Sequence, residues 1–258
     1  MRRVVMIIAI VILAATAGYY FFIITKSRQQ KLSNTSKSES NNRIIDTSTA
    51  ENLDFTNPKK SAHYETNTPA HGEILAGVPI NVVIDFNFDL ASPSEIKINM
   101  NGKDFGVGNT VIDDGGLSMR RAMKNDAPDG IYSVFYNACW PDGSCHNGSF
   151  QFAVNRSLSS DFSDLTNNPE VTIDMNSLQF SDEKIRISNG TKVTWNNLEN
   201  VAHFINTNPH PAHSYYPVMN SRSIGQGESF SVTFNEAGIY LYHCSAHPLT
   251  MRGYILVE

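Results

Sequence analysis

The stretch that decides the fold of this chain lies near its C-terminus and reads GIYLYHCSAHPLTMRG, residues 238–253. It holds a thiol, an imidazole and a thioether: Cys244, His247 three residues later, and Met251 four residues after that. Runs typical of β-strands stand on both sides, at residues 238–243 and 254–257. A loop anchored by two strands leaves these side chains little freedom, so we expect all three to converge on one point.

One thiolate with two imidazoles in a trigonal arrangement, and a long weak bond to Met, is the ligand set of a blue copper centre. The second imidazole must come from elsewhere in the chain. His203 is the candidate, because it follows the run VTWNN (residues 193–197), where a strand passes into a loop. A soft thiolate and borderline imidazoles satisfy both Cu(I) and Cu(II), so little rearrangement accompanies electron transfer. The pattern therefore predicts one type 1 copper site.

Two other interpretations fit the same residues. Taken singly, Cys244 is a small buried residue, His247 a surface residue and Met251 a core residue. Their combination in this order between two strands favours copper over that interpretation. A Cys/His nucleophilic enzyme is the other alternative. No helix opens at Cys244 and no oxyanion donor is evident, so we predict that the chain is not an enzyme.

Residues 169–258 resemble the cupredoxins, the plastocyanin/amicyanin type of small blue copper domain. The resemblance rests on VTWNN before His203, on GIYLYHC (residues 238–244) and on the Cys-x-x-His-Pro loop. It implies a Greek-key β-sandwich, copper bound by His203, Cys244, His247 and Met251, and an electron port at the exposed edge of His247. The Cys-to-His spacing is that of amicyanin. The His-to-Met interval is one residue longer, as in azurins, and remains compatible with Met251 as axial ligand.

Three further histidines lie close to this site in the sequence. His243 adjoins Cys244, but alternation along a strand points it away from the metal, so it is not assigned as a ligand. His210 and His213 lie in a proline-punctuated loop after His203. Such a loop is usually plain surface, and the alternative is a rim where partners dock or a second copper is handed over.

Residues 61–156 form the first predicted folded unit. Four strands are expected, at residues 80–88, 95–100, 131–136 and 149–154, and Asn-Gly or Asp-Gly turns stand beside three of them. Several short strands separated by turn signals indicate a β-sandwich. With the second unit, the fold class is all-β: two β-sandwiches, CopC/Ig-like and then cupredoxin.

The first unit resembles the CopC family of periplasmic copper-binding sandwiches. The resemblance rests on TPAHG (residues 68–72), DGIYSV (129–134) and GSFQFAV (148–154). The family implies a Cu(II) site made by an amino-terminal His and an Asp-x-His pair. Here Ser61 and Ser144 stand at the two histidine positions, and Asp142 stands at the position of the Asp.

Two interpretations of this first unit follow. In one, the sandwich has lost its copper site, and Cys139 and Cys145 bridge a loop around Trp140. In the other, a second copper site is rebuilt from residues that offer imidazole and carboxylate donors, which suit Cu(II). Its members would be His63, Asp142 and His146, with His71 as an additional candidate.

The remaining sequence predicts where the protein resides. If Cys244 binds metal, Cys139 and Cys145 remain as an even pair, and a local disulfide points outside the cytosol. After Arg2 and Arg3, residues 4–24 are uncharged and mostly apolar, long enough to cross a bilayer. We predict an uncleaved transmembrane anchor at residues 1–25, with a cleavable signal peptide as the alternative.

Composition and charge limit the partners. Residues 26–60 are rich in Ser, Asn, Thr and Lys and are expected to be a disordered linker, and residues 157–168 a shorter one. The net charge of −5 and the lack of a basic domain argue against nucleic acid as a partner. The predicted function is a one-electron carrier at a cell membrane, facing the periplasm or the extracellular space, that serves redox partner proteins there. The alternative is copper trafficking or resistance that uses both domains. A scaffold with vestigial metal sites is a weaker one.

Overall fold

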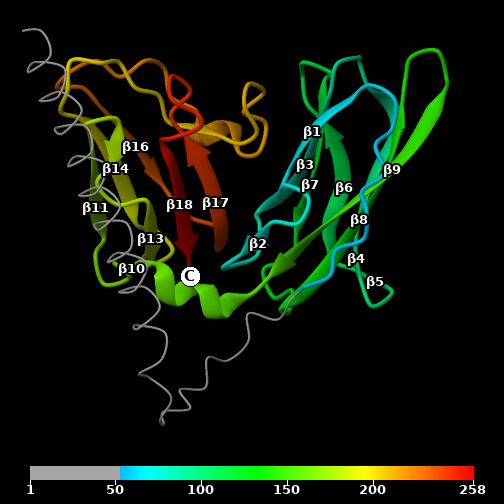
Figure 1. Ribbon diagram of the computed structural model, residues 1–258, viewed down its shortest axis with the longest axis horizontal. Coiled ribbons are helices and arrows are strands. Elements are labelled where there is room, and N and C mark those ends of the chain that lie inside the picture. Colours follow the sequence, from blue (N-terminus) through cyan, green and yellow to red (C-terminus); the bar gives the residue numbers. More distant parts are fainter. Residues whose placement is uncertain (1–52) are drawn as a thin grey trace, which may run out of the picture. The chain divides into compact units, whose positions relative to one another are not determined.

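The computed structural model describes residues 53–258, and the regular secondary structure of this part is almost entirely β-strand (Figure 1). The predicted anchor at residues 1–25, and the predicted linker up to residue 52, lie outside the described residues. Within residues 53–258 there is no helix long and apolar enough to cross a membrane. The all-β prediction is confirmed for the described part.

The first sandwich contains two sheets. One has the strand order β1-β3-β7-β6, with bounds Tyr64–Thr68, Asn81–Phe86, Ser118–Met123 and Gly106–Ile112. The other has the order β2-β9-β8-β4-β5, with bounds Ile74–Leu75, Cys145–Val154, Gly130–Cys139, Ala91–Met100 and Lys103–Asp104. The four predicted strands correspond to β3, β4, β8 and β9.

Alternation explains which face of each strand joins the core. Strand β8 buries Tyr132, Val134 and Tyr136 and leaves the residues between them more exposed, so one face joins the core. The predicted disulfide is present and joins Cys139 at the end of β8 to Cys145 at the start of β9. The turn that it closes carries the buried Trp140.

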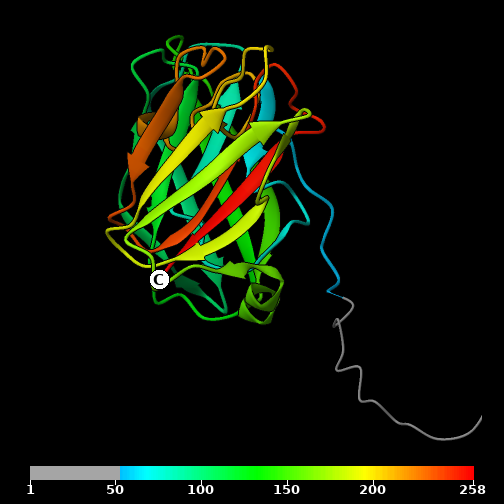
Figure 2. The same ribbon diagram turned by 90° about the vertical axis from the view of Figure 1, so that its left-hand side faces the viewer.

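The second sandwich also has two sheets, seen in Figure 2. One has the order β10-β13-β18-β17-β15, with bounds Ser163–Asp164, Lys184–Ile187, Arg252–Val257, Gly238–His243 and Asn206–Thr207. The other has the order β12-β11-β14-β16, with bounds Gln179–Phe180, Glu170–Asn176, Lys192–Asn197 and Ser229–Thr233. Strands β13 and β18 pair in parallel although they are far apart in sequence, and β17 and β18 pair antiparallel. A short 3₁₀ helix, η2 (Pro217–Met219), lies between β15 and β16.

Two segments differ from the linkers that composition predicts. Residues 157–168 contain most of a 3₁₀ helix, η1 (Arg156–Asp161), and strand β10, which pairs with β13. Phe162 and Leu165 pack against the core, so these few apolar residues tie a polar segment to the second sandwich. At the end of the first predicted linker, Lys59 exchanges two backbone hydrogen bonds of 2.8 Å with Ser149. The folded part therefore begins before residue 61.

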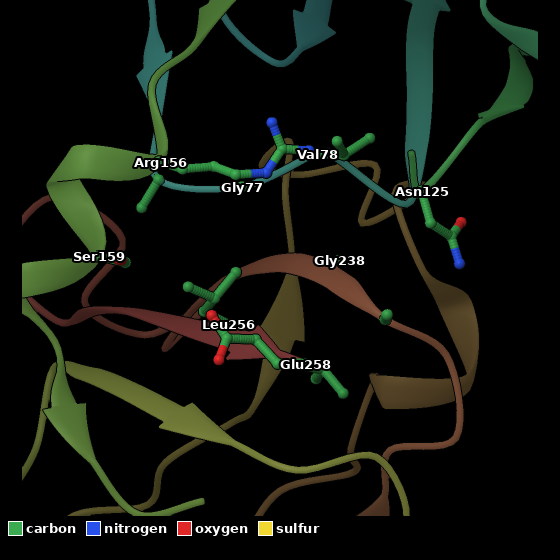
Figure 3. Close-up of a pocket in the computed structure, with 11 residues that line it drawn as sticks. Gly77, Val78, Asn125, Arg156, Ser159, Gly238, Leu256 and Glu258 are labelled. Carbon is green, nitrogen blue, oxygen red and sulfur yellow. The ribbon is translucent and has the colours of Figure 1, made fainter. Parts of the chain in front are cut away.

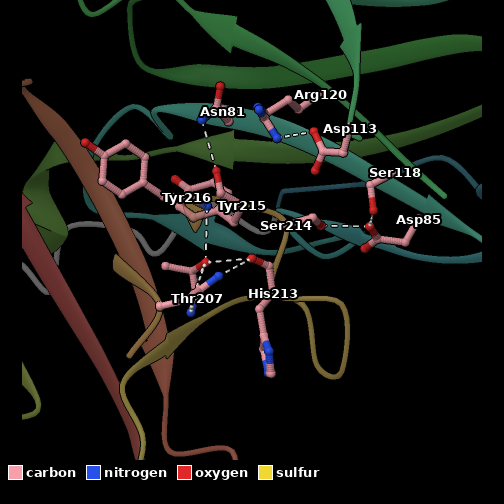
Figure 4. Close-up of polar contacts among 11 residues, drawn as sticks. Asn81, Asp85, Asp113, Ser118, Arg120, Thr207, His213, Ser214, Tyr215 and Tyr216 are labelled. Carbon is pink, nitrogen blue, oxygen red and sulfur yellow. Dashed lines mark hydrogen bonds and ion pairs between the residues drawn. The ribbon is translucent and has the colours of Figure 1, made fainter. Parts of the chain in front are cut away.

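The two sandwiches contact each other within this one unit of residues 53–258 (Figure 4). The Tyr215 hydroxyl accepts a hydrogen bond from the Ile80 amide and donates one to the Ile239 carbonyl, at 3.1 and 2.6 Å. The Ser214 hydroxyl donates to Oδ1 of Asp85 at 2.7 Å, and Ser118 donates to the same oxygen. Asp85 is 3% exposed, and burial raises its pKa to about 6 against the effect of these two hydrogen bonds.

Candidate metal centres

Strand β17 and the loop after it position the predicted thiolate ligand. The Cys244 amide donates to the Met251 carbonyl at 2.9 Å, so the β17–β18 hairpin continues past the strand end. Within the loop, the His247 amide donates to the Cys244 carbonyl at 2.9 Å and the Met251 amide to the His247 carbonyl at 3.0 Å. These bonds close the loop on itself, because each backbone group that leaves the ladder finds a partner nearby.

His203 lies in the loop that follows β14, a strand of the other sheet, and a buried asparagine holds this loop. Its amide and carbonyl exchange hydrogen bonds with Ile224 at 3.0 and 2.9 Å. Asn197, fully buried at the end of β14, donates from Nδ2 to the carbonyls of Val201 and Ile224 at 2.7 and 2.9 Å. Its Oδ1 accepts from the Glu199 amide at 3.0 Å. One side chain therefore fixes both ends of the loop that carries His203.

The structure brings together Cys244, His203 and His247. Nδ1 of His203 lies 3.5 Å from Sγ of Cys244, and Nδ1 of His247 lies 3.7 Å from it. All three donor atoms lie within 4.8 Å of one another. Protein metal–sulfur and metal–nitrogen bonds of about 2.3 and 2.0 Å, set about 120° apart, separate S from N by about 3.7 Å. The donor atoms therefore fit a trigonal metal ion.

The three residues differ in how far they are buried. Cys244 and His203 are buried, whereas His247 is only partly buried. Met251 is buried too, and its backbone bonds to Cys244 and His247 hold it at the site. Its role as axial ligand stays a prediction.

Glu199 orients His203. Nε2–H of His203 donates to Oε1 of Glu199 at 2.9 Å, which leaves Nδ1 as the free lone pair facing Cys244. The Leu178 amide, and after it the His203 ring, hold the pKa of Glu199 below its usual range. The carboxylate is thus ionised and fixes one tautomer of the imidazole.

A second group of three imidazoles lies close by. The sequence offered His210 and His213 only as the alternative of a rim where a second copper is handed over, and it did not assign His243 as a ligand. His210, His213 and His243 each offer a ring nitrogen, and these atoms lie within 4.8 Å of one another. Burial, and then the neighbouring imidazoles, lower the pKa of His243 to about 4, and burial also lowers that of His213. The available signal was the direction of His243, which alternation along β17 turns away from the copper ligands.

The residues predicted for a site in the first sandwich do not converge in the same way. Among residues 53–258, neither group of three potential ligands includes His63, Asp142, His146 or His71. The rings of His63 and His146 both contact Trp140, at centroid distances of 5.3 and 6.3 Å. Asp142 accepts hydrogen bonds from the backbone and hydroxyl of Ser144, at 2.9 and 2.7 Å. Nδ1 of His71 accepts from the Gln151 amide at 3.1 Å.

A cavity of about 190 Å³ lies away from both histidine groups (Figure 3). Its lining includes Gly77, Val78, Gly238, Leu256 and the ion-paired Arg156, and it contains neither an imidazole nor a thiol. A Cβ on Gly77 would meet the Leu256 side chain at 2.5 Å, so glycine permits the close approach of these segments. This cavity offers no ligand set for a metal.

Comparison with known proteins divides the chain at the same place. Residues 167–258 match the family model of copper binding proteins of the plastocyanin/azurin family, and residues 64–155 match that of the CopC domain. Amicyanin from Paracoccus denitrificans is 30% identical over 93 residues, which is 34% of this chain and 65% of the relative. Amicyanin-alpha from Methylorubrum extorquens is 31% identical over 81 residues, or 31% of this chain and 66% of the relative. The chain thus spans just under two thirds of these relatives.

Solved structures of amicyanin variants are also similar. A reduced Cu(I) form and an oxidised form are each 26% identical and cover 39% of this chain and 89% of their own, with TM-scores of 0.30 and 0.31. The family matches and the donor set agree on copper as the cofactor.

Proposed function

We propose that this chain, in which a domain of the plastocyanin/azurin family follows a CopC domain, is a one-electron carrier. His203, Cys244 and His247 hold the copper, with Met251 as axial ligand. The observation that carries the proposal is the convergence of one thiol and two imidazoles at sulfur–nitrogen distances of 3.5 and 3.7 Å. Bound copper supplies a one-electron Cu(I)/Cu(II) couple, and this donor set suits both oxidation states.

The protein residues hold this donor set in place. Backbone hydrogen bonds fix the Cys244–Met251 loop, and Asn197 fixes the loop before His203. Glu199 holds the His203 ring in one orientation. Buried aromatic residues lie beneath the site, where Nε1–H of Trp195 donates to the Tyr242 hydroxyl at 3.2 Å. A site fixed in this way changes little when its charge changes, which favours fast electron transfer.

Electrons enter and leave at His247 in this proposal. Its ring is the partly exposed one of the three metal ligands. Leu249, in the same loop, is 81% exposed, and Leu198 and Val201, in the loop before His203, are also exposed. Exposed apolar side chains around a redox centre suit a short-lived contact with a partner protein. We assign this end of the second sandwich as the docking surface for redox partners.

The proposal also places the protein at a membrane, outside the cytosol. The disulfide between Cys139 and Cys145 supports an oxidising compartment. The apolar residues 4–24 support an anchor, and the polar linker that follows supports tethered movement between partners.

A second function, copper trafficking or resistance, is favoured by two observations. A CopC domain precedes the copper domain, and a second group of three imidazoles lies beside the copper ligands. Copper exchange distinguishes the two functions. A carrier keeps the copper at Cys244, whereas a trafficking protein releases copper readily to an acceptor.

The test of the main proposal measures both the redox cycling of the bound copper and its loss to a chelator. The copper-loaded full chain should cycle between Cu(I) and Cu(II) in voltammetry without losing metal to a chelator of moderate affinity. Loss of copper from the Cys244 site in each reduced cycle would refute the carrier proposal and favour trafficking.

A further inference from the structure

We propose that Nδ1 of His210 and Nε2 of His213 and His243 form a second metal site, which binds a divalent transition-metal cation and Cu(II) most tightly. The distances support this assignment. Nδ1 of His210 lies 3.4 Å from Nε2 of His213 and 3.4 Å from Nε2 of His243. Two nitrogens bound to one metal at about 2.0–2.1 Å with tetrahedral angles are about 3.3 Å apart.

The His243 ring is held in the tautomer that a metal needs. Its Nδ1–H donates to Oδ1 of Asn208 at 3.0 Å, which leaves the lone pair of Nε2 directed at His210. An outer hydrogen bond of this kind is the usual partner of a metal-binding imidazole. His243 is buried at the end of β17, so its ring position is set by the strand and does not depend on the loop.

The loop that carries the other two imidazoles is fixed by its own hydrogen bonds. The His213 amide donates to the Pro209 carbonyl at 2.7 Å, and its carbonyl accepts from Nδ2 of Asn220 at 2.8 Å. His213 has φ of +53°, a conformation uncommon for a residue with a Cβ. His210 stands between Pro209 and Pro211, which restrict its backbone. These hydrogen bonds and prolines fix the backbone of the loop, and the backbone directs the rings of His210 and His213 toward each other.

Two polar side chains, those of Ser245 and Asn206, lie next to the His213 ring. Oγ of Ser245 lies 3.0 Å from Nε2 of His213, and Nδ2 of Asn206 donates to that hydroxyl at 2.7 Å. A cation bound at Nε2 takes the lone pair that this hydroxyl faces, so metal binding replaces the contact between Ser245 and His213. Nδ2 of Asn206 also lies 3.5 Å from Nδ1 of His213. No carboxylate completes this group in residues 53–258, so three neutral nitrogens define its chemistry.

Three neutral imidazoles select the metal. Imidazole suits copper, zinc and nickel, and among divalent ions Cu(II) binds a given nitrogen site most strongly. Three protein ligands leave a position for water or a small anion. Both His210 and His243 line a cavity of about 380 Å³ that also contains Arg252, so this position is accessible.

The site has a consequence for the copper at Cys244, which rests on the proposed function. His243 and Cys244 are consecutive, so a cation at His243 adds positive charge one residue away from the thiolate. Positive charge stabilises Cu(I) relative to Cu(II), because Cu(I) carries the smaller charge. Occupation of the second site should therefore raise the reduction potential of the first.

Binding is tested with the full chain carrying Cys244→Ser and His203→Ala, which removes the thiolate and one of the two imidazoles of the first site. Titration with Cu(II), followed by electron paramagnetic resonance, should show one tetragonal copper with nitrogen ligands. His210→Ala and His213→Asn should each weaken it on the order of 100-fold or more, and Asn keeps the left-handed backbone at 213. Asn208→Ala should weaken it roughly 10- to 100-fold, as outer hydrogen-bond partners do. His146→Ala, an exposed histidine of the first sandwich, is the matched control and should change nothing.

The proposal is overturned if the affinity is the same with and without His210. It is also overturned if His146→Ala removes the copper, which would place the site in the first sandwich. Since the thiolate is absent from this background, neither outcome bears on the proposed electron carrier.

The effect on potential is measured separately. One equivalent of Zn(II), added to the chain with copper at Cys244, should raise the midpoint potential of that copper. His210→Ala should abolish the rise. An unchanged potential, with zinc shown to be bound at the three histidines, would refute the coupling and leave the second site in place.

Discussion

The two sandwiches use similar residues to different ends. Each contains histidines near the end of a β-hairpin, His146 beside Cys145 in the first and His243 beside Cys244 in the second. In the first sandwich, His63 and His146 pack against Trp140, and the two cysteines form a disulfide bond. In the second, the thiol stays free and loops from two sheets turn imidazoles toward it. Convergence of backbone elements, more than the presence of ligand residues, makes the metal centre.

The largest effect should follow from removing the buried imidazole ligand. His203→Ala leaves Cys244 and His247 without their third donor, so copper affinity should fall on the order of 100-fold or more and the blue colour should be lost. Added imidazole should enter the space and restore part of the colour, which a misfolded variant would not allow. The matched change in the first sandwich, His63→Ala, should leave the copper spectrum intact. A colourless His63→Ala variant would show that the first sandwich contributes to the blue copper site, against this comparison.

A smaller effect should follow from the asparagine that fixes the loop of His203. Asn197→Ala removes three hydrogen bonds, to the carbonyls of Val201 and Ile224 and from the Glu199 amide, and a typical bond of this kind contributes about 0.5–1.5 kcal/mol. We expect the free energy of unfolding to fall by about 2–4 kcal/mol. Asn196→Ala, the neighbouring and less buried residue, should cost less than about 0.5 kcal/mol. Equal losses in urea unfolding of the two variants would show that Asn197 does not organise this loop.

The contact between the sandwiches should give the smallest effect, and it depends on pH. Burial raises the pKa of Asp85 from 3.8 to about 6, so ionisation is easier in the unfolded chain. The contribution of Asp85 to stability is therefore complete below about pH 4 and is lost as pH rises through 6. A shift of this size corresponds to at most about 3 kcal/mol.

Asp85→Asn keeps the shape of the side chain and an oxygen that accepts from Ser118 and Ser214, but the amide does not titrate. The variant should unfold at higher urea than the natural chain at pH 7, and at a similar concentration at pH 4.5. Asp89→Asn, an exposed change nearby, should leave the pH profile as it is. An Asp85→Asn profile with the natural slope between pH 4 and 6 would contradict this assignment.

Local spacing made part of the copper site predictable. Cys244, His247 and Met251 stand on one loop between two strands, so their proximity follows from the sequence alone. His203 was predicted from its place after the strand at residues 193–197, but its approach to Cys244 does not follow from spacing, because that strand lies in the other sheet. The strands were predictable too, since β8 and β11 alternate between buried and more exposed residues.

Other features depend on contacts that no local pattern encodes. The group of His210, His213 and His243 forms only because the loop after β15 folds back on β17, which alternation alone does not reveal. Residues 157–168 look like a linker by composition, yet Phe162 and Leu165 attach them to the core. The ligands expected around Asp142 are positioned by Trp140 and by hydrogen bonds within the turn, which the spacing of Asp142 and His146 does not show.

One measurement tests the central claim most directly. The full chain carrying His210→Ala receives one equivalent of Cu(II), and its visible and electron paramagnetic resonance spectra are recorded beside those of the same chain with Cys244→Ser added. The arrangement of Cys244, His203 and His247 predicts an intense thiolate-to-copper charge-transfer band that is absent from the variant. A pale spectrum with tetragonal copper, identical in both proteins, would show that this group does not form a type 1 centre.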